Sequence, residues 1–185
     1  MPFDDSHFPA LLAGAQRGDA KSIEALYLDL QPRVLRYLRS IEPRQADDLA
    51  AEVWLAVAKG IRSFDGDAVA FRGWLFTIAR RRVADHRRAA ARRPADHGVP
   101  DDLPGGSDPA DVVVDRLSGQ QAVDLIQAVL PGEQADVLLL RVLGGLDVTE
   151  VAKVLERTPN WVRVAQHRGL RRLAAALGEK TSAPV

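Results

Sequence analysis

The sequence LPGEQADVLLLRVLGGLDVTEVAKVLERTPNWVRVAQHRGLRRLAAAL, residues Leu130–Leu177, carries the clearest structural signal in this chain. It predicts a helix, a short turn, a small helix, a second turn and a long basic helix. Asp147 is a suitable N-cap and Glu150 follows it at the third helical position, so we expect a helix to begin at Val148. Thr158-Pro159 starts the next helix, because proline at the first helical position loses no hydrogen bond.

This layout is typical of a DNA-reading helix-turn-helix, because the second helix has no Asp or Glu between Thr158 and Leu177. In the major groove Arg can hold guanine and Asn can hold adenine. We expect reading residues in the first two turns and phosphate-positioning residues beyond them. The reading set is Asn160, Trp161, Arg163, Val164 and His167, and the positioning set is Arg168, Arg171 and Arg172.

Three apolar residues of the same helix, Val162, Leu170 and Leu173, are expected in the core. Trp161 has two interpretations, a contact with thymine or sugar and a cover over the domain core. Taken alone, the segment also fits a helical hairpin whose basic face is only solvated.

Composition predicts an all-α protein of one or two domains. The chain has 185 residues, is 46% hydrophobic and contains few aromatic residues. It has no cysteine, and His7, His86, His97 and His167 lack the spacing of metal ligands, so we expect neither a metal site nor a cofactor. No apolar run approaches the ~20 residues of a membrane span and the N-terminus lacks a secretory pattern, so we expect no membrane insertion and a cytoplasmic location.

Charge is strongly segregated, although the formal net charge is zero. Residues 78–93 hold seven Arg against one Asp, whereas residues 94–115 hold six Asp and no Lys or Arg. The second stretch is also rich in Pro and Gly, which predicts a flexible acidic linker. The expected organisation is a helical domain over residues 1–93, the linker over 94–115, a helix-turn-helix domain over 116–178 and a short frayed tail over 179–185.

The first domain is expected to contain three or four helices. The helix predicted over residues 46–61 buries Leu49 and Val53 and leaves acidic residues Asp47, Asp48 and Glu52 on another face. A long helix is predicted from Phe71 to about Ala91, with a core stripe of Phe71, Trp74, Leu75 and Ile78. Its opposite face is expected to carry Arg72, Phe76, Thr77, Arg80, Arg81, Asp85 and Arg88.

Both halves resemble extracytoplasmic-function sigma factors of bacterial RNA polymerase (group IV). The motifs are ADDLAAEVWL at 46–55, FRGWLFTIAR at 71–80 and VADHRR at 83–88, followed by Leu130-Pro131, LLLR at 138–141 and the helix-turn-helix. The resemblance implies a transcription initiation factor with no catalytic activity of its own. It implies core RNA polymerase (clamp helices and flap) and promoter DNA as partners, with an anti-sigma factor as a further candidate.

The resemblance also implies roles for individual residues. Asp47, Asp48 and Glu52 would dock on the clamp helices. The loop with Phe64 and Asp65 would hold a base flipped from the minus-10 element, while Arg72, Arg80, Arg81 and Arg88 would contact its phosphates. The recognition helix would read the minus-35 element. Ala51, Arg81 and Asn160-Trp161 depart from the usual family residues, which bears on promoter preference more than on role.

Two rival functions follow from the same features. An operator-binding regulator would need a dimer interface that places two recognition helices about 34 Å apart. A helical adaptor without DNA contact would fit the acidic helix but not the basic ones. Run-off transcription with core polymerase discriminates among all three.

Overall fold

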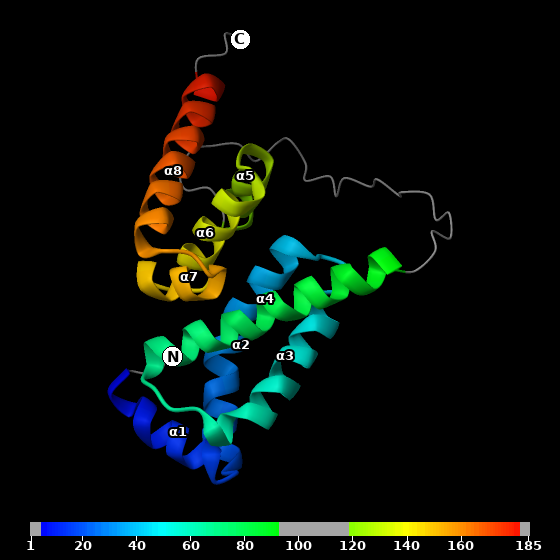
Figure 1. The fold of residues 1–185 in the computed structure, drawn as a ribbon, viewed down its shortest axis with the longest axis vertical. Helices are drawn as coiled ribbons and strands as arrows, with labels where there is room; N and C mark the ends of the chain where they lie inside the picture. The colour runs from blue at the N-terminus through cyan, green and yellow to red at the C-terminus, as the bar shows by residue number, and fades with distance from the viewer. Residues whose placement is uncertain (1–4, 93–118, 182–185) are drawn as a thin grey trace.

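The computed structural model describes residues 5–92 and 119–181, which form eight α-helices and two short 3-10 turns (Figure 1). The all-α prediction is confirmed. The predicted linker over residues 94–115 lies outside the described residues. The first half contains α1 (Phe8–Gln16), α2 (Ala20–Ile41), α3 (Ala46–Gly60) and α4 (Ala68–Arg92), and the second contains α5 (Gly119–Val129), α6 (Gly132–Val142), α7 (Val148–Leu155) and α8 (Pro159–Thr181).

In the first half, helices α1 to α4 enclose an apolar core. Asp19 caps α2 by accepting a hydrogen bond from the Ser22 amide at 2.9 Å. Leu49 and Val53 of α3 are buried, as the helical periodicity predicts. Phe71 of α4 is fully buried and its ring centroid lies 5.4 Å from that of Phe8 in α1. These contacts fix the start of α4 against α1 and α3.

In the second half, α7 and α8 form the predicted helix-turn-helix. Asp147 caps α7 by accepting a hydrogen bond from the Glu150 amide at 2.8 Å. The helix ends at Glu156, a non-glycine residue with φ 54°, and this left-handed residue turns the chain toward α8. α8 begins at Pro159, as expected, and continues as far as Thr181, beyond the end of the predicted basic helix at Leu177.

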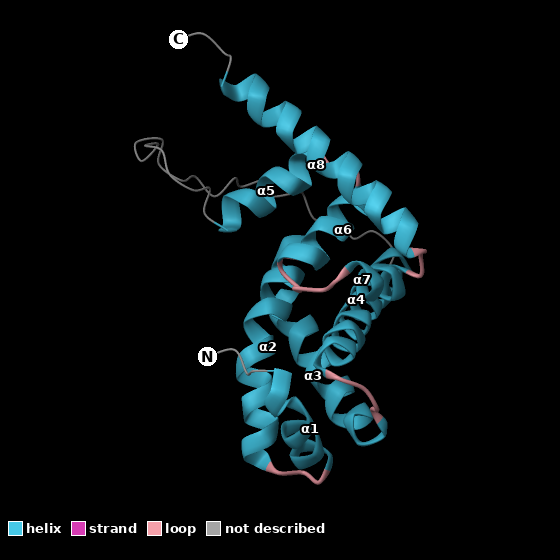
Figure 2. Cartoon of the chain, turned by 90° about the vertical axis from the view of Figure 1, so that its left-hand side faces the viewer, coloured by secondary structure: helices cyan, strands magenta, loops and turns pink. Residues whose placement is uncertain are grey.

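The two halves pack directly on each other. α7 lies along α4 in both views, and α5 contacts α2 (Figures 1 and 2). The buried side chains of both halves form one continuous apolar cluster. The motif analysis placed α4 and α7 in separate domains and did not predict this contact.

The packing of the two halves buries Phe76, which was predicted on the open face of α4. The expectation that Phe76 shares the open face of α4 with the arginines is wrong, because its side chain is fully buried. Its ring lies edge-on to Tyr37, with ring centroids 5.3 Å apart. A Cβ added to Gly144, in the turn before α7, would lie only 3.3 Å from Phe76. Phe76 therefore belongs to the core that joins the halves.

Asp136 of α6 is a half-buried carboxylate between the halves. Burial raises its pKa, Arg80 and Arg87 of α4 partly oppose this, and Glu133 adds to it. The neighbouring Tyr37 hydroxyl of α2 also has a raised pKa, chiefly because it is buried and secondarily because of Asp136. The folded protein therefore holds the Asp136 proton more tightly than the unfolded chain does. Protonation of Asp136 therefore stabilises the folded protein fully below about pH 3.9, the usual pKa of Asp in an unfolded chain. This contribution to the free energy of unfolding is lost as pH rises through the raised pKa of Asp136 in the folded protein.

We therefore expect Asp136→Asn to raise the melting temperature at pH 7, because the neutral amide avoids burying a charge. A gain of about 1 kcal/mol corresponds to roughly 2–4 °C for a chain of this size. The gain should shrink as pH falls from 7 to 4, because the raised pKa lets Asp136 take up its proton at a higher pH than an ordinary Asp does. Thermal unfolding at both pH values measures this, with the exposed Glu24→Gln as control. A lower melting temperature for Asp136→Asn at pH 7 would show that attraction to Arg80 and Arg87 outweighs burial.

Candidate nucleic-acid interface and acidic docking face

The first turns of α8 present an open polar surface. Asn160, Arg163 and His167 are exposed, and Val164 is 41% exposed. The Thr158 hydroxyl caps the helix by accepting a hydrogen bond from the Trp161 amide at 3.2 Å. This local geometry brings the predicted minus-35 reading residues to one accessible helix end.

Trp161 is half-buried and packs against the core of its own half. The Arg157 guanidinium lies over its indole, 5.4 Å from the ring centroid, and also pairs with Glu133 at 2.8 Å. Both interpretations of Trp161 thus have a structural basis, because one side covers the core and part of the indole reaches the surface.

The later turns of α8 carry the predicted positioning residues. Arg168, Arg171 and Arg172 are exposed and line one shallow surface depression with Ala175. Arg172 also donates to the Gln134 side chain of α6 at 3.0 Å. A cluster of guanidinium groups on one open surface suits contact with phosphates.

The core predictions for α8 had mixed outcomes. Val162 is fully buried, as predicted, and Leu173 is partly buried against the core. The prediction for Leu170 is wrong, because its side chain is 50% exposed. Gly169 takes the inward position instead, where an added Cβ would lie 3.4 Å from Leu130 and Leu138. A residue without a side chain gives no periodicity signal, so the sequence pattern missed it.

Hydrogen bonds from α1 fix the loop that precedes α4. Gln16 of α1 donates hydrogen bonds to the carbonyl oxygens of Phe64 at 2.8 Å and Ile61 at 3.1 Å. The Phe64 ring is half-buried, with its centroid 5.2 Å from that of Phe71 and 5.1 Å from that of Trp74. Asp65 is exposed. The structure thus places Phe64 in an aromatic cluster and Asp65 at the surface of the same loop.

The arginines of α4 divide into two groups. Arg72 and Arg80 are half-buried, whereas Arg81 and Arg88 are exposed. Arg80 lies close enough to Asp136 of α6 to act on the pKa of that carboxyl. Arg88 pairs with Asp85, and this hydrogen bond holds the pKa of Asp85 below its usual value. The predicted minus-10 residues therefore do not form one open surface in this conformation.

The acidic residues of α3 lie together and are exposed, as the spacing predicts. Asp47 lies 3.4 Å from Arg39 of α2, and Glu52 lies 4.0 Å from Arg82 of α4. Exposed pairs of this kind contribute little stability, so the carboxylates stay available to a basic partner at small cost.

An apolar groove borders this acidic face and was not predicted. Leu55 is 62% exposed, and the ring centroids of Tyr27 and Trp54 lie 5.0 Å apart beside it. The Trp54 indole donates to Gln31 at 2.6 Å, which fixes the ring orientation. Leu55 lies out of phase with the buried Leu49 and Val53, and this was the available signal.

Within residues 5–92 and 119–181, no three His, Asp or Glu side chains gather as metal ligands would. Among the helices in the described part of the chain, none is both long and apolar enough to cross a membrane.

Comparison with known proteins gives a consistent result. The family models Sigma-70 region 2 and Sigma-70, region 4, match residues 26–93 and 120–173. The chain is 37% identical over 177 residues to the ECF RNA polymerase sigma factor ShbA of Streptomyces griseus, which covers 90% of this chain and 93% of that protein. It is 32% identical over 182 residues to the ECF sigma factor SigD of Mycobacterium tuberculosis, covering 94% of this chain and 85% of that protein.

Solved structures show the same fold. The sigma factor RpoE of Bartonella quintana, in complex with the anti-sigma factor NepR, gives a TM-score of 0.67 at 19% identity and covers 86% of this chain and 98% of its own. CnrH in complex with the cytosolic domain of CnrY gives 0.64 at 22% identity, covering 92% and 96%.

Proposed function

Because this chain belongs to the extracytoplasmic-function (ECF) sigma factors, we propose that its exposed charged faces divide polymerase docking, promoter reading and promoter melting among separate residues. As a member of the family it is a promoter-recognising sigma factor that binds core RNA polymerase and promoter DNA. The presence of regions 2 and 4 on one chain carries this conclusion over the operator-binding regulator and the helical adaptor.

In this proposal the acidic face of α3 docks on the clamp helices of core polymerase. Asp47, Asp48 and Glu52 supply the charge, and the exposed Leu55 beside them supplies apolar contact area. Charge gives orientation and association rate, while the desolvated apolar part adds affinity. The helix-turn-helix half contacts the polymerase flap when it sits on the minus-35 element.

The two DNA surfaces perform different work. Asn160, Arg163 and His167 read base edges in the minus-35 major groove, while Arg168, Arg171 and Arg172 hold phosphates. At the minus-10 element the loop with Phe64 and Asp65 receives a flipped base, and the arginines of α4 hold the adjoining backbone.

The free-energy cost of melting must be offset by contacts with the protein, because flipping a base costs a few kcal/mol. Stacking recovers about 1–3 kcal/mol per base, and phosphate contacts supply the rest. Phe64 fixes the position of this loop, because its ring packs against the rings of Phe71 and Trp74 in α4. RNA synthesis itself belongs to the polymerase, so this chain acts as an initiation factor rather than an enzyme, and we place it in the cytoplasm with its promoter.

The test is run-off transcription with core polymerase over a promoter library. We expect specific transcripts only when this chain is added, and we expect sequence preferences at two separated elements. Binding to duplex DNA without any polymerase-dependent transcript would support the operator-binding regulator. Polymerase binding without sequence preference would support the adaptor.

A further inference from the structure

One side of the recognition helix carries an accessible apolar surface. Trp161 and Val164 of α8 are three residues apart and therefore lie on one face of the helix. Val164 is 41% exposed, and the half-buried Trp161 indole also reaches the surface. With Glu133 and Arg168, these two side chains line a depression between α8 and the first turn of α6. The apolar surface thus lies at the helix end that carries the polar minus-35 reading residues.

The Trp161 indole is contacted by Arg157, which lies in the turn between α7 and α8. The Arg157 guanidinium lies over the indole, 5.4 Å from the ring centroid, and donates a hydrogen bond to the Glu133 carboxylate of α6 at 2.8 Å. One cation therefore bridges the first turns of α6 and α8. An exposed ion pair of this kind contributes little in water, but DNA that covers it lowers the local dielectric and strengthens the attraction.

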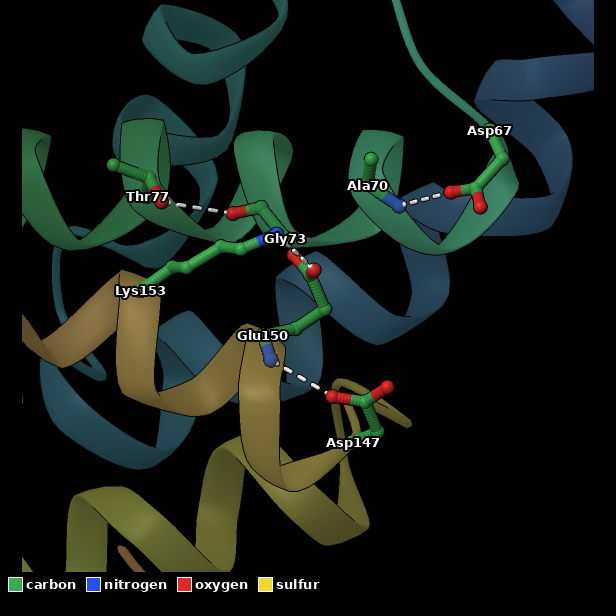
Figure 3. A network of polar contacts seen from close by, with 7 residues as sticks. All are labelled: Asp67, Ala70, Gly73, Thr77, Asp147, Glu150 and Lys153. Carbon is green, nitrogen blue, oxygen red and sulfur yellow. Dashed lines mark hydrogen bonds and ion pairs between the residues drawn. The ribbon is translucent and has the colours of Figure 1, made fainter. Parts of the chain in front are cut away.

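The backbone on both sides of this bridge is fixed by hydrogen bonds. Asp147 caps the start of α7 (Figure 3), and at the end of the same helix the Arg157 amide donates to the Ala152 carbonyl at 2.9 Å. The Trp161 amide donates to the Thr158 hydroxyl at 3.2 Å. Because both backbone positions are already ordered, the contact between guanidinium and indole costs less conformational entropy.

The chemistry of this surface matches one feature of DNA. Among the four bases only thymine presents an apolar group in the major groove, its 5-methyl group, and apolar side chains recognise it by contact. Asn160, Arg163 and His167 offer hydrogen-bonding groups, which suit the polar edges of the bases. Val164 and the face of the Trp161 ring present carbon atoms instead, so they suit the methyl group.

We propose that Trp161 and Val164 form a subsite for the 5-methyl group of one thymine in the minus-35 element, and that Arg157 and Glu133 are positioning residues for this subsite. Arg157 holds the indole in the orientation that receives the methyl group. Glu133 holds Arg157 on the indole and away from the DNA phosphates. The pair therefore adds sequence preference and withholds one cation from sequence-independent binding. This inference rests on the proposed promoter function.

Uracil substitution isolates the methyl group, because deoxyuridine pairs with adenine as thymidine does and lacks only this group. In the promoter that the run-off library selects, each thymine of the minus-35 element is replaced in turn. Binding is titrated with holoenzyme assembled from core polymerase and this chain. We expect one position at which uracil weakens binding about three- to fivefold, as the loss of one buried methyl contact predicts. Equal binding of thymine and uracil at every position, or a selected element without thymine, would overturn the subsite.

Two substitutions with opposite effects on charge test the positioning residues. Arg157→Gln removes a cation and should weaken binding to every sequence. Glu133→Gln removes a carboxylate and frees Arg157 for phosphates, so it should strengthen binding to every sequence. Both variants should nevertheless lower the ratio of thymine to uracil affinity at the identified position. A loss of local structure would weaken binding in both variants, so the opposite shifts distinguish positioning from a purely structural role.

Glu156→Gln is the matched control for Glu133→Gln. It makes the same change in charge at an exposed residue of the same helix-turn-helix, and it should keep the parent's thymine-to-uracil ratio. An unchanged ratio in either Arg157→Gln or Glu133→Gln would overturn the positioning role of that residue.

Val164→Ala and Trp161→Ala remove the subsite itself and should bring the thymine-to-uracil ratio close to one. Trp161 also packs against the core, so Val164→Ala provides the variant in which an exposed side chain is shortened. An unchanged ratio in both variants would overturn the subsite. Absence of promoter-specific binding by the parent holoenzyme would instead contradict the proposed function.

Discussion

Reversal of charge at Asp48 and Glu52 together, to lysine, should weaken binding to core polymerase at least tenfold and reduce run-off transcription accordingly. Both side chains are exposed on α3, so the change removes attraction to a basic partner and adds repulsion. Like-charge juxtaposition at an interface costs roughly several kcal/mol, and about 1.4 kcal/mol is already tenfold in affinity. Titration of labelled protein with core polymerase measures the effect, which should diminish as salt rises.

The fold should survive this double substitution. The ion pair between Glu52 and Arg82 is long, at 4.0 Å, and exposed pairs of this kind contribute little stability. Helical circular dichroism and melting temperature should therefore stay close to those of the parent. Glu24→Lys/Glu156→Lys is the matched control, since it makes the same change in net charge at exposed residues outside α3. Equal polymerase affinity for the α3 variant and this control would refute the docking assignment.

The second large effect concerns the minus-35 element. Arg163→Ala should cost about 1–3 kcal/mol on the cognate site and relax preference at one base pair, because Arg holds guanine through two hydrogen bonds. Arg171→Ala should weaken binding to all sequences alike and reduce the salt dependence by about one ion. Both residues are exposed on α8, so neither change disturbs the core.

Lysine substitutions sharpen this comparison. Arg171→Lys should bind almost as well as the parent, because a phosphate accepts any positive charge. Arg163→Lys should stay impaired, because lysine cannot reproduce the planar pair of donors. Binding to a library of minus-35 duplexes at two salt concentrations provides the measurement. The same sequence profile for both alanine variants would refute the division into reading and positioning residues.

The helices were predictable because their signals are local. Asp147 caps α7 and Thr158-Pro159 opens α8 at the positions that capping rules indicate. The buried stripe of α3 followed from spacing alone, and the family motifs correctly identified the sigma factor. The failures have local reasons too. Leu170 was predicted in the core but is exposed, because Gly169 provides the close approach to Leu130 and to Leu138 of α6.

The sequence by itself determined the helical class, the start of each helix-turn-helix helix and the charge of each surface, because caps, periodicity and composition act over a few residues. Only the tertiary structure decided that α4 packs on α7. Phe76 and Glu150 look like surface residues by their positions in charged or capping segments, yet both are buried where the halves meet. Their burial depends on residues from the other half of the chain, which no local pattern encodes. The physical reason is that the sequence of a helix decides whether its face is apolar or polar, but only a distant partner of matching shape can cover that face. Here Gly73 of α4 leaves the space that the Glu150 side chain of α7 occupies (Figure 3).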